Sequence, residues 1–514
     1  QLSGNHWRAR TVEFFDYTDW NDNLVTGRTW LPYRRNTYRG NLLFAHDVAT
    51  RQGFFFLKEA PCSSTQLHYN GSDFVADFSD FMVVGLGIAS DDVKPDSWTR
   101  VYGCVTGVYT GDEQEALTAL RLYQKQLRHH TAAQDEMIML NTWGDRSQDA
   151  KIDEAFCLAE LDRAARLGVT LFQLDDGLQS GKSPNSKTAG GSFKDIWKNA
   201  DYWTPNPTKF PHGLKRIVEK GKKLGIRIGL WFNASIQNDF ADWQKDAQVI
   251  IGLYKEYGIC CFKIDGLQIP TKTAEQNLRR LFDAVLAQTN HEVIFNLDAT
   301  AGRRGGYHYM NEYGNIFLEN RYTDWGNYYP YRTLRNLWML SRYVPAEKMQ
   351  IEFLNKWRNA DKYSTTDPFA PARYSFDYLF AITLAAQPLA WMEASNLPEE
   401  AYATATLLKE YQPLQLQFHQ GIILPIGEEP SGRSWTGFQS IVSDTQGYLI
   451  IYREDNDIAK RTIDTWLPEG KKVTFTPLMG NGKKFVAEVG VQGKVSFELN
   501  DKNSFTLYQY QVKP

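Results

Sequence analysis

Cysteine is scarce in this 514-residue chain, and its positions follow no metal-binding pattern. The odd count argues against a disulfide framework, and the absence of C-x-x-C spacing argues against a zinc site. At most one bridge, between Cys62 and Cys104, is conceivable. The five cysteines are Cys62, Cys104, Cys157, Cys260 and Cys261, and the adjacent pair is expected to be buried in a strand.

The chain also lacks a long apolar run and an excess of charge of either sign. No stretch reaches the roughly 18 apolar residues of a spanning helix, so no membrane span is expected. Lys and Arg total 57 and Asp and Glu total 60, which gives a formal net charge of −3. This balance offers no attraction to nucleic acid or to an anionic membrane. Hydrophobic residues at 42% and charged residues at 23% are typical of globular domains.

Methionine is missing from the first position, where Gln1 stands. This is consistent with the removal of a signal peptide, and we expect a secreted or periplasmic protein. A cytoplasmic protein trimmed at its start is the alternative.

Several catalytic motifs are absent as well. There is no dinucleotide-binding G-x-G-x-x-G after the first strand of the α/β region, no phosphate-binding loop and no G-x-S-x-G elbow. Apart from His129-His130, the nine histidines are scattered, so a metal-dependent hydrolase is disfavoured and no cofactor is expected. Aromatic residues are abundant, at 14% with 15 Trp. Their rings can stack on sugars, although core packing is the alternative for most of them.

The sequence divides into three regions of different periodicity. Residues 1–130 and 416–514 contain short runs of aromatic and β-branched residues separated by turn residues, which is typical of β-domains. In residues 131–415, about eight strand-like runs alternate with helix-like runs, which predicts a (β/α)8 barrel. The predicted fold class is therefore α/β, with a central TIM barrel flanked by an N-terminal β-sandwich-like domain and a C-terminal β-sandwich.

In such a barrel, the reactive residues lie at the C-terminal ends of the strands, around one mouth. The predicted strand ends are rich in acids and aromatic residues and poor in histidine, which favours glycosidic bond cleavage by two carboxylates. In strand order they are Asn141-Thr142-Trp143, Asp175-Asp176-Gly177, Trp231-Phe232-Asn233, Lys263-Ile264-Asp265-Gly266, Asp298, Glu319-Asn320-Arg321 with Thr323-Asp324-Trp325, and Asn355.

Lys263 and Asp265 are two residues apart, so in a strand both point to one face, which we predict to be the barrel lumen. A lysine beside this aspartate keeps it ionised, as a nucleophile must be. A buried ion pair without chemistry is the alternative. A lyase or aldolase that uses Lys263 as a Schiff-base amine is disfavoured, because the neighbouring carboxylate raises the pKa of the ammonium group.

Asp175 and Asp176 could bind a cation, cap a helix or hold vicinal sugar hydroxyls, and the hydroxyl interpretation is favoured because no histidine clusters nearby. Trp143 and Trp231 each close a strand and could wall a sugar site, with plain packing as the alternative. Residues 178–211 exceed an ordinary barrel loop, which predicts a lid or a leaving-group site. Within that segment the candidate pocket residues are Asp195, Trp197, Asp201 and Trp203.

At these positions the chain resembles glycoside hydrolase clan D, the α-galactosidase group of families 27 and 36. Asp175-Asp176-Gly177 resembles the clan's second-strand Asp-Asp-Gly-Trp, with Leu178 in place of the Trp. Gly229-Leu230-Trp231-Phe232 resembles its third-strand motif, and Lys263-x-Asp265 resembles the motif whose Asp is the nucleophile. The β-rich flanks resemble family 36, whose barrel lies between two β-domains.

The resemblance implies a retaining, exo-acting α-glycosidase, α-galactosidase-like, that cleaves a terminal sugar from an oligosaccharide or polysaccharide by double displacement. Asp265 would be the nucleophile. Asp324 matches the position of the acid/base after the sixth strand, with Glu319 as its rival. Relatives in the clan are often oligomers, which is compatible with an oligomer here. The residues that would bind sugar hydroxyls are Asp175, Asp176, Lys263 and Arg321.

Three departures from family 36 bear on the substrate. Asn233 follows Phe232 where the family continues Phe-Glu-Pro-Glu, residues 298–306 replace its Cys-Ser-Gly-Gly-Gly-Gly-Arg pattern, and its Ser-Asp-Asn after the sixth strand is absent. The terminal sugar is therefore open between galactose, another α-linked sugar and a β-L-arabinopyranoside. A catalytically silent carbohydrate-binding protein on the same barrel is the alternative from another class.

Overall fold

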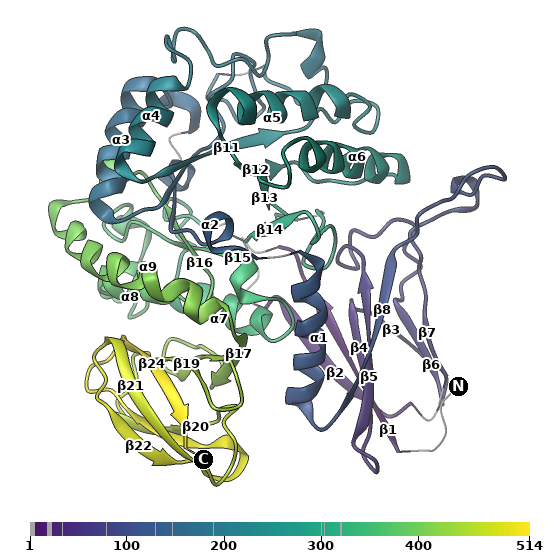
Figure 1. Ribbon diagram of the computed structural model, residues 1–514, viewed down its shortest axis with the longest axis vertical. Coiled ribbons are helices and arrows are strands. Elements are labelled where there is room, and N and C mark those ends of the chain that lie inside the picture. The colour runs from purple at the N-terminus through teal and green to yellow at the C-terminus, as the bar shows by residue number, and fades with distance from the viewer. Residues whose placement is uncertain are drawn as a thin grey trace.

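The computed structural model describes residues 6–513 except 18–22, 33, 79, 129, 146–147, 189, 300, 303 and 319–320. A barrel with its surrounding helices forms the largest part of the molecule (Figure 1). The N-terminal strands stand beside it, and the C-terminal strands, in yellow, lie below it. Within the described ranges, no helix combines the length and apolarity needed to cross a bilayer.

Eight parallel strands close into the predicted barrel, in which each strand pairs with the next and the last pairs back to the first. Most of their residues are buried on both faces, which explains why they form nearly continuous apolar runs in the sequence. The strands are β9 (Met139–Asn141), β10 (Leu171–Leu174), β11 (Arg227–Asn233), β12 (Cys261–Asp265), β13 (Ile294–Leu297), β14 (Gly314–Phe317), β15 (Met349–Phe353) and β16 (Gln387–Trp391).

Helices follow most of these strands, but none lies between β13 and β14 among the described residues. Three of them end at a glycine in the left-handed conformation, Gly168, Gly225 and Gly258, with φ of 96°, 71° and 71°. Glycine adopts this conformation without strain, so these helix ends are readable in the sequence. The helices are α3 (Glu154–Leu167), α4 (Lys215–Leu224), α5 (Trp243–Tyr257), α6 (Lys272–Gln288), α7 (Pro330–Ser341), α8 (Phe376–Ala381) and α9 (Ala405–His419).

The N-terminal region contains two antiparallel sheets that share a small core including Trp7, Phe54 and Phe74, so it is sandwich-like as expected. Helices α1 (Glu113–Leu127) and α2 (Ala132–Asp135) lead from it to the barrel. The larger sheet has the order β2 (Val25–Trp30), β1 (Trp7–Phe14), β4 (Leu42–Asp47), β5 (Gln52–Glu59) and β8 (Gly103–Thr110), and the smaller has β3 (Asn36–Tyr38), β6 (Phe74–Asp77) and β7 (Asp80–Val83).

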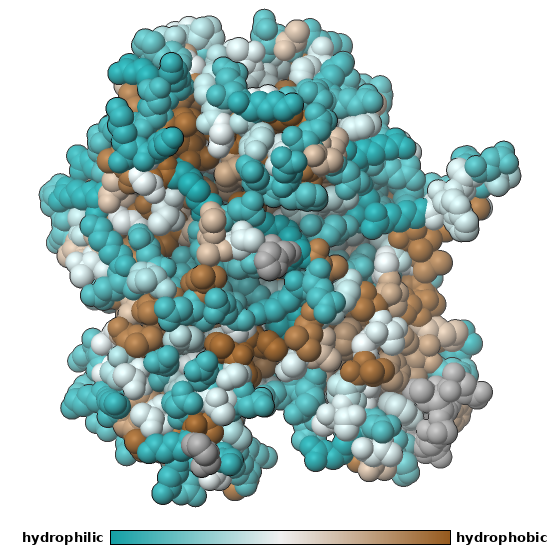
Figure 2. Space-filling view, in the orientation of Figure 1, coloured by the Kyte–Doolittle hydropathy of each residue, from teal (hydrophilic) through white to brown (hydrophobic). Residues whose placement is uncertain are grey.

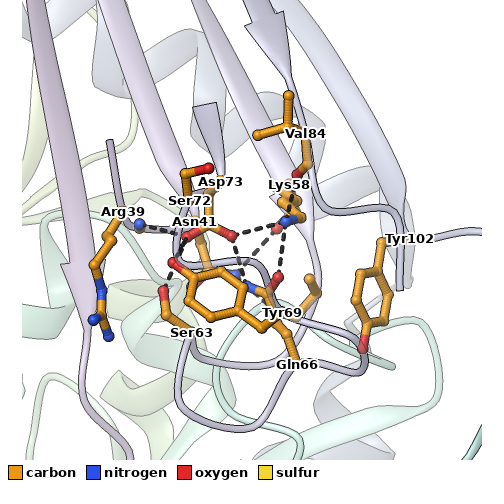
Figure 3. Close-up of polar contacts among 12 residues, drawn as sticks. Arg39, Asn41, Lys58, Ser63, Gln66, Tyr69, Ser72, Asp73, Val84 and Tyr102 are labelled. Atoms are coloured by element: carbon orange, nitrogen blue, oxygen red, sulfur yellow. Dashed lines mark hydrogen bonds and ion pairs between the residues drawn. The ribbon is translucent and has the colours of Figure 1, made fainter. Parts of the chain in front are cut away.

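A buried ion pair fixes the segment between β5 and β6 (Figure 3). Lys58 Nζ lies 2.8 Å from Asp73 Oδ1, and the two side chains are 1% and 0% exposed. A charge in an apolar interior is tolerated only when partners surround it. Here Lys58 also donates to Gln66 and to the Val84 carbonyl, and Asp73 also accepts from Gln66, Ser63, Tyr69 and the N–H of Gly40.

The C-terminal region is also built of two antiparallel sheets. Asn481 and Gly482 lie between the paired strands β21 (Lys472–Gly480) and β22 (Phe485–Glu488), as their hairpin signal predicts. The larger sheet has the order β17 (Ile422–Gly427), β18 (Trp435–Ile441), β19 (Gln446–Arg453), β24 (Ser504–Val512), β21 (Lys472–Gly480) and β22 (Phe485–Glu488), and the smaller pairs β20 (Lys460–Ile463) with β23 (Val495–Glu498).

One hydrophobic core runs through all three regions, from Phe14 in β1 through the barrel to Leu507 in β24. Figure 2 shows a mostly hydrophilic face on which hydrophobic residues gather where the flanking strands meet the barrel. All five cysteines are free. The bridge considered between Cys62 and Cys104 is therefore wrong: Cys62 is buried, whereas Cys104 is exposed.

Candidate active site

Two adjacent strands bring a carboxylate to the mouth of the barrel. In the register of β11 and β12, Trp231 lies opposite Lys263 and Asn233 lies opposite Asp265. Alternate residues of a strand share a face, so Lys263 and Asp265 project from the same side of β12. Asp265 is the last residue of this strand and therefore lies at the C-terminal end of the barrel.

The Asp265 carboxylate is held in its charged form. Its Oδ1 accepts from the Gly266 N–H at 2.7 Å and lies 2.7 Å from Arg304 Nη1, and its Oδ2 accepts from Trp231 Nε1 at 3.1 Å. Burial opposes ionisation, but the charges of Arg304 and Lys263 outweigh it and lower the pKa of Asp265 to about 2. The side chain is 16% exposed. An ionised carboxylate that is still reachable has the properties of a nucleophile.

Arg304 is a site residue that the sequence reasoning missed. Its Nη1 lies 2.8 Å from Asp298 Oδ1 as well as close to Asp265. The loop that carries it is held by the N-terminal region: Tyr17 forms a β-bridge with Ala301, and Tyr307 donates to the Phe15 carbonyl at 2.9 Å. The available signal was a basic residue after the fifth strand, but its position depends on a region almost 300 residues earlier in the chain.

Lys263 lies deeper in the barrel than Asp265 and is nearly buried. Its Nζ donates to Asp175 Oδ2 at 3.1 Å and lies 3.7 Å from Asp298 Oδ2. Asn141 Nδ2 donates to the same Asp175 oxygen at 2.7 Å. The first, second and fourth strands thus contribute to one hydrogen-bonded cluster, which an ion pair joins to Asp298 after the fifth strand. The structure brings Asp175 and Lys263 into contact, and the charge of Lys263 acts on Asp265.

Asp176, by contrast, contacts the long loop that follows it. Gln179 Nε2 donates to its Oδ1 at 2.5 Å, and Ser183 and Asn185 donate to its Oδ2. Burial raises the pKa of Asp176 to about 6, although these hydrogen bonds oppose the rise. Both oxygens are therefore engaged in holding the loop, which is the role the structure shows for this residue.

The two predicted tryptophans differ in their surroundings. Trp231 is 4% exposed, donates to Asp265 and packs against Trp203 and Phe193 of the long loop, with ring centroids 5.9 and 5.8 Å away. Trp143 is half-buried in a short 3-10 helix, Thr142–Asp145. Trp231 thus connects the loop to the proposed nucleophile.

A cavity of about 380 Å³ opens beside Asp265 and Arg304. The long loop contributes Asn185 and Phe193 to its wall, whereas Trp197 of the same loop donates to Asp246 Oδ1 at 3.0 Å. The other described residues that line it are Asn233, Ile236, Asp239, Phe240, Gly266, Gln268 and Pro270.

Two predicted site residues, Arg321 and Asp324, follow the sixth strand, β14. Arg321 is 2% exposed, and Asp324 lies in the turn of residues 323–326. Neither is among the described residues that line the Asp265 cavity. Glu319, the rival acid, lies outside the described residues. Glu352 is the last residue but one of the seventh strand, β15, and burial raises its pKa to about 7, against the opposing charge of Arg321.

Among the described residues, one group of side chains that could hold a metal ion lies at the opposite end of the barrel. His130, Glu136 and His419 have ligand atoms within 4.8 Å of one another. Glu136 precedes the first strand, and its oxygens lie 2.6 Å from His130 Nε2 and 2.7 Å from His419 Nδ1. Separation by 283 residues hid this group from the sequence reasoning. Hydrogen bonds between imidazole and carboxylate account for these short distances.

Part of this sequence is similar to a known protein family. Residues 104–253 match the Melibiase family model. Probable α-galactosidase C of Aspergillus terreus is 32% identical over 158 residues, 27% of this chain and 20% of that protein. α-Galactosidase C of Emericella nidulans is 32% identical over 139 residues, 24% of this chain and 17% of that protein. The matches thus span about a fifth of the length of these relatives.

The fold has wider matches. The family 36 α-galactosidase AgaA of Geobacillus stearothermophilus aligns with a TM-score of 0.71 and 12% identity, covering 99% of this chain and 75% of that one. Variants of that enzyme have been solved in complex with raffinose and with stachyose. At this identity the likeness shows the fold alone. Together, the family model and the fold confirm the resemblance to clan D and to the architecture of family 36.

Proposed function

We propose that this chain is an exo-acting retaining α-glycosidase, α-galactosidase-like, in which Asp265 is the nucleophile. One observation carries the proposal. A strand-end carboxylate lies beside a cavity at the barrel mouth, and the charges of Arg304 and Lys263 keep it ionised. The matching relatives are named α-galactosidases, and this supports the choice of reaction.

In the proposed reaction, Asp265 attacks the anomeric carbon through Oδ2. This oxygen accepts from Trp231 at 3.1 Å, a longer contact than the two that hold Oδ1 at 2.7 Å. Oδ1 stays fixed by Gly266 and Arg304. A second carboxylic acid protonates the leaving oxygen, and its conjugate base then activates the water that releases the sugar. We assign this second role to Asp324, which follows the sixth strand.

The terminal sugar would bind above Lys263 and Asp175, whose ammonium and carboxylate groups suit hydroxyl groups, with Arg321 as a further ligand. The raffinose and stachyose complexes of the Geobacillus stearothermophilus enzyme support oligosaccharides as the substrate class. Schiff-base chemistry at Lys263 is disfavoured, because Asp175 and Asp298 both stabilise the charged ammonium form over the reactive amine.

The test is hydrolysis of nitrophenyl α- and β-glycosides by the wild type and by Asp265→Ala. The wild type should cleave an α-galactoside or a related α-glycoside and release the sugar first as its α anomer, as NMR detects. Asp265→Ala should lose at least about 1,000-fold in kcat while it keeps its circular dichroism spectrum. Azide should restore turnover and give a glycosyl azide of inverted configuration. Wild-type rates in Asp265→Ala would refute the assignment.

A further inference from the structure

The loop that follows β11 has an unusual backbone. Asn238, Asp239 and Phe240 are consecutive non-glycine residues in the left-handed conformation, with φ of 47°, 57° and 59°. L-residues visit this region as single residues, because the Cβ atom approaches the backbone carbonyl. A run of three persists only where its surroundings enforce it, and such strain concentrates at ligand-binding sites.

The surroundings of this loop do enforce its shape. Asp246 Oδ2 accepts from the Ser235 N–H at 2.9 Å, and Asn277 Nδ2 donates to the Asp239 carbonyl at 2.9 Å. Phe240 is 2% exposed and so anchors the end of the run in the core. These contacts hold the loop on both sides, and we call residues 233–240 the wall.

This wall belongs to the cavity that Asp265 lines. Asn233, Ile236, Asp239 and Phe240 all contribute to it. Asn233 is 1% exposed, and its Oδ1 has no hydrogen-bond partner in the described part of the chain. A buried acceptor without a donor costs free energy, so an unpaired amide oxygen beside a cavity points to a ligand that donates to it.

The described lining of the cavity includes Asp265 but neither Asp175 nor Lys263. Asp175 and Lys263, the proposed ligands of the terminal sugar, are 3% and 5% exposed in their side chains and lie deeper in the barrel. An exo-acting enzyme binds the terminal unit at the bottom of its site, and the remainder of the substrate extends toward the mouth. The wall, at the end of β11 and in the loop that follows, is therefore placed to contact the part of the substrate beyond the scissile bond.

We propose that the wall formed by Asn233, Ile236 and Asp239 binds the leaving-group sugar, with Asn233 Oδ1 and the Asp239 carboxylate as acceptors for its hydroxyls. This inference rests on the proposed function and names the second unit of its substrate. Phe193 and Ile236 supply an apolar surface for the C–H face of the ring. Both polar groups accept hydrogen bonds, and Asp239 repels a uronate, so the ligand is a neutral hexose or pentose.

The test compares kcat/KM on raffinose with kcat/KM on 4-nitrophenyl α-galactoside, which share a terminal sugar and differ in the leaving group. Asp239→Gly removes the carboxylate at a position where glycine suits the backbone. It should lower the raffinose-to-aryl ratio by about 10-fold or more, mainly through KM. Asp239→Asn keeps an acceptor and should stay within about 3-fold of the wild-type ratio. Asp242→Asn, whose carboxylate pairs with Lys245 at 2.8 Å and does not line the cavity, is the matched control.

Several outcomes would overturn the inference. Equal losses on both substrates would show that Asp239 acts on the terminal sugar or on the fold. An unchanged ratio in Asp239→Gly would show that the wall does not touch the leaving group. If kcat fell as much in Asp239→Asn as in Asp239→Gly, Asp239 would be acting as a proton donor in the reaction and not as a hydrogen-bond acceptor for the leaving group. If the wild type cleaves neither substrate, the proposed α-galactosidase function fails, and this inference fails with it.

Discussion

Arg304 Nη1 lies 2.7 Å from Asp265 Oδ1, so the loop after the fifth strand governs the charge of the residue that ends the fourth. The same nitrogen lies 2.8 Å from Asp298 Oδ1. One guanidinium group thus neutralises part of a two-carboxylate cluster, which has Lys263 as its other cation. Burial and the charge of Asp265 raise the pKa of Asp298, and the charges of Arg304 and Lys263 oppose that rise, so the loss of either cation would favour a proton on one of the two carboxyl groups.

Arg304→Met tests this relationship. Arg304 lowers the pKa of Asp265, so its removal should raise that pKa and move the acid limb of the kcat/KM profile to higher pH, by about one unit or more. Arg304→Lys keeps the charge and should shift the limb less. An acid limb in Arg304→Met that coincides with the wild-type limb would show that Arg304 does not control this ionisation.

The acid/base assignment is tested by leaving-group dependence. Asp324→Asn and Glu319→Gln should be compared on an alkyl α-glycoside and on a dinitrophenyl α-glycoside. The variant that lacks the true acid should lose about 100-fold or more on the alkyl substrate and far less on the activated one, whose leaving group needs no proton. We expect this pattern for Asp324→Asn. Its appearance in Glu319→Gln alone would transfer the role to Glu319.

Stability should fall as pH rises from about 4 to 7. Carboxyl groups of the unfolded chain titrate near pH 4, whereas several buried carboxyl groups have a raised pKa in the folded chain. Between pH 4 and 7 the folded state therefore binds more protons than the unfolded state. The free energy of unfolding then decreases with pH across this window, by roughly 1.4 kcal/mol for each unit by which one group is raised. Burial raises the pKa of five such groups: to about 7 for Asp246, Glu352 and Glu454, and to about 6 for Asp145 and Asp176.

Urea unfolding at pH 5 and pH 7.5 measures this dependence. Asp246→Asn replaces one of these acids with an amide that does not titrate, so the variant should show a smaller difference between the two pH values than the wild type. Asp162→Asn, at an exposed position, is the control and should leave the difference unchanged. A wild type that is more stable at pH 7.5 would contradict the prediction.

Lys58→Met should destabilise the N-terminal region by about 3–5 kcal/mol, because it leaves the Asp73 carboxylate buried without its cation. Arg51→Met breaks a pair with Asp112 in which the two side chains are 62% and 70% exposed. This control should cost less than about 1 kcal/mol. Thermal unfolding of both variants tests the contrast, and similar losses in the two would show that burial of the Lys58 pair is unimportant.

Much of the site was predictable because barrel chemistry follows strand ends. Lys263 and Asp265 share a face by the two-residue period of a strand, and the parallel register places Trp231 and Asn233 beside them. The long loop was predicted as a separate element, but the residues named as pocket candidates in it are not among those that line the Asp265 cavity. Trp197 and Trp203 anchor the loop against Asp246 and Phe232, whereas Asn185 and Phe193 line the cavity.

The sequence alone determined the barrel, the flanking β-regions and the strand that carries Asp265, because helix and strand periods, glycine stops and i, i+2 spacing are local properties of the chain. Only the tertiary structure decided that Arg304 pairs with Asp265, that Asp176 holds the long loop and that Glu136 lies between His130 and His419. These contacts join residues whose distance in space depends on how loops and regions pack, and no local pattern encodes that distance.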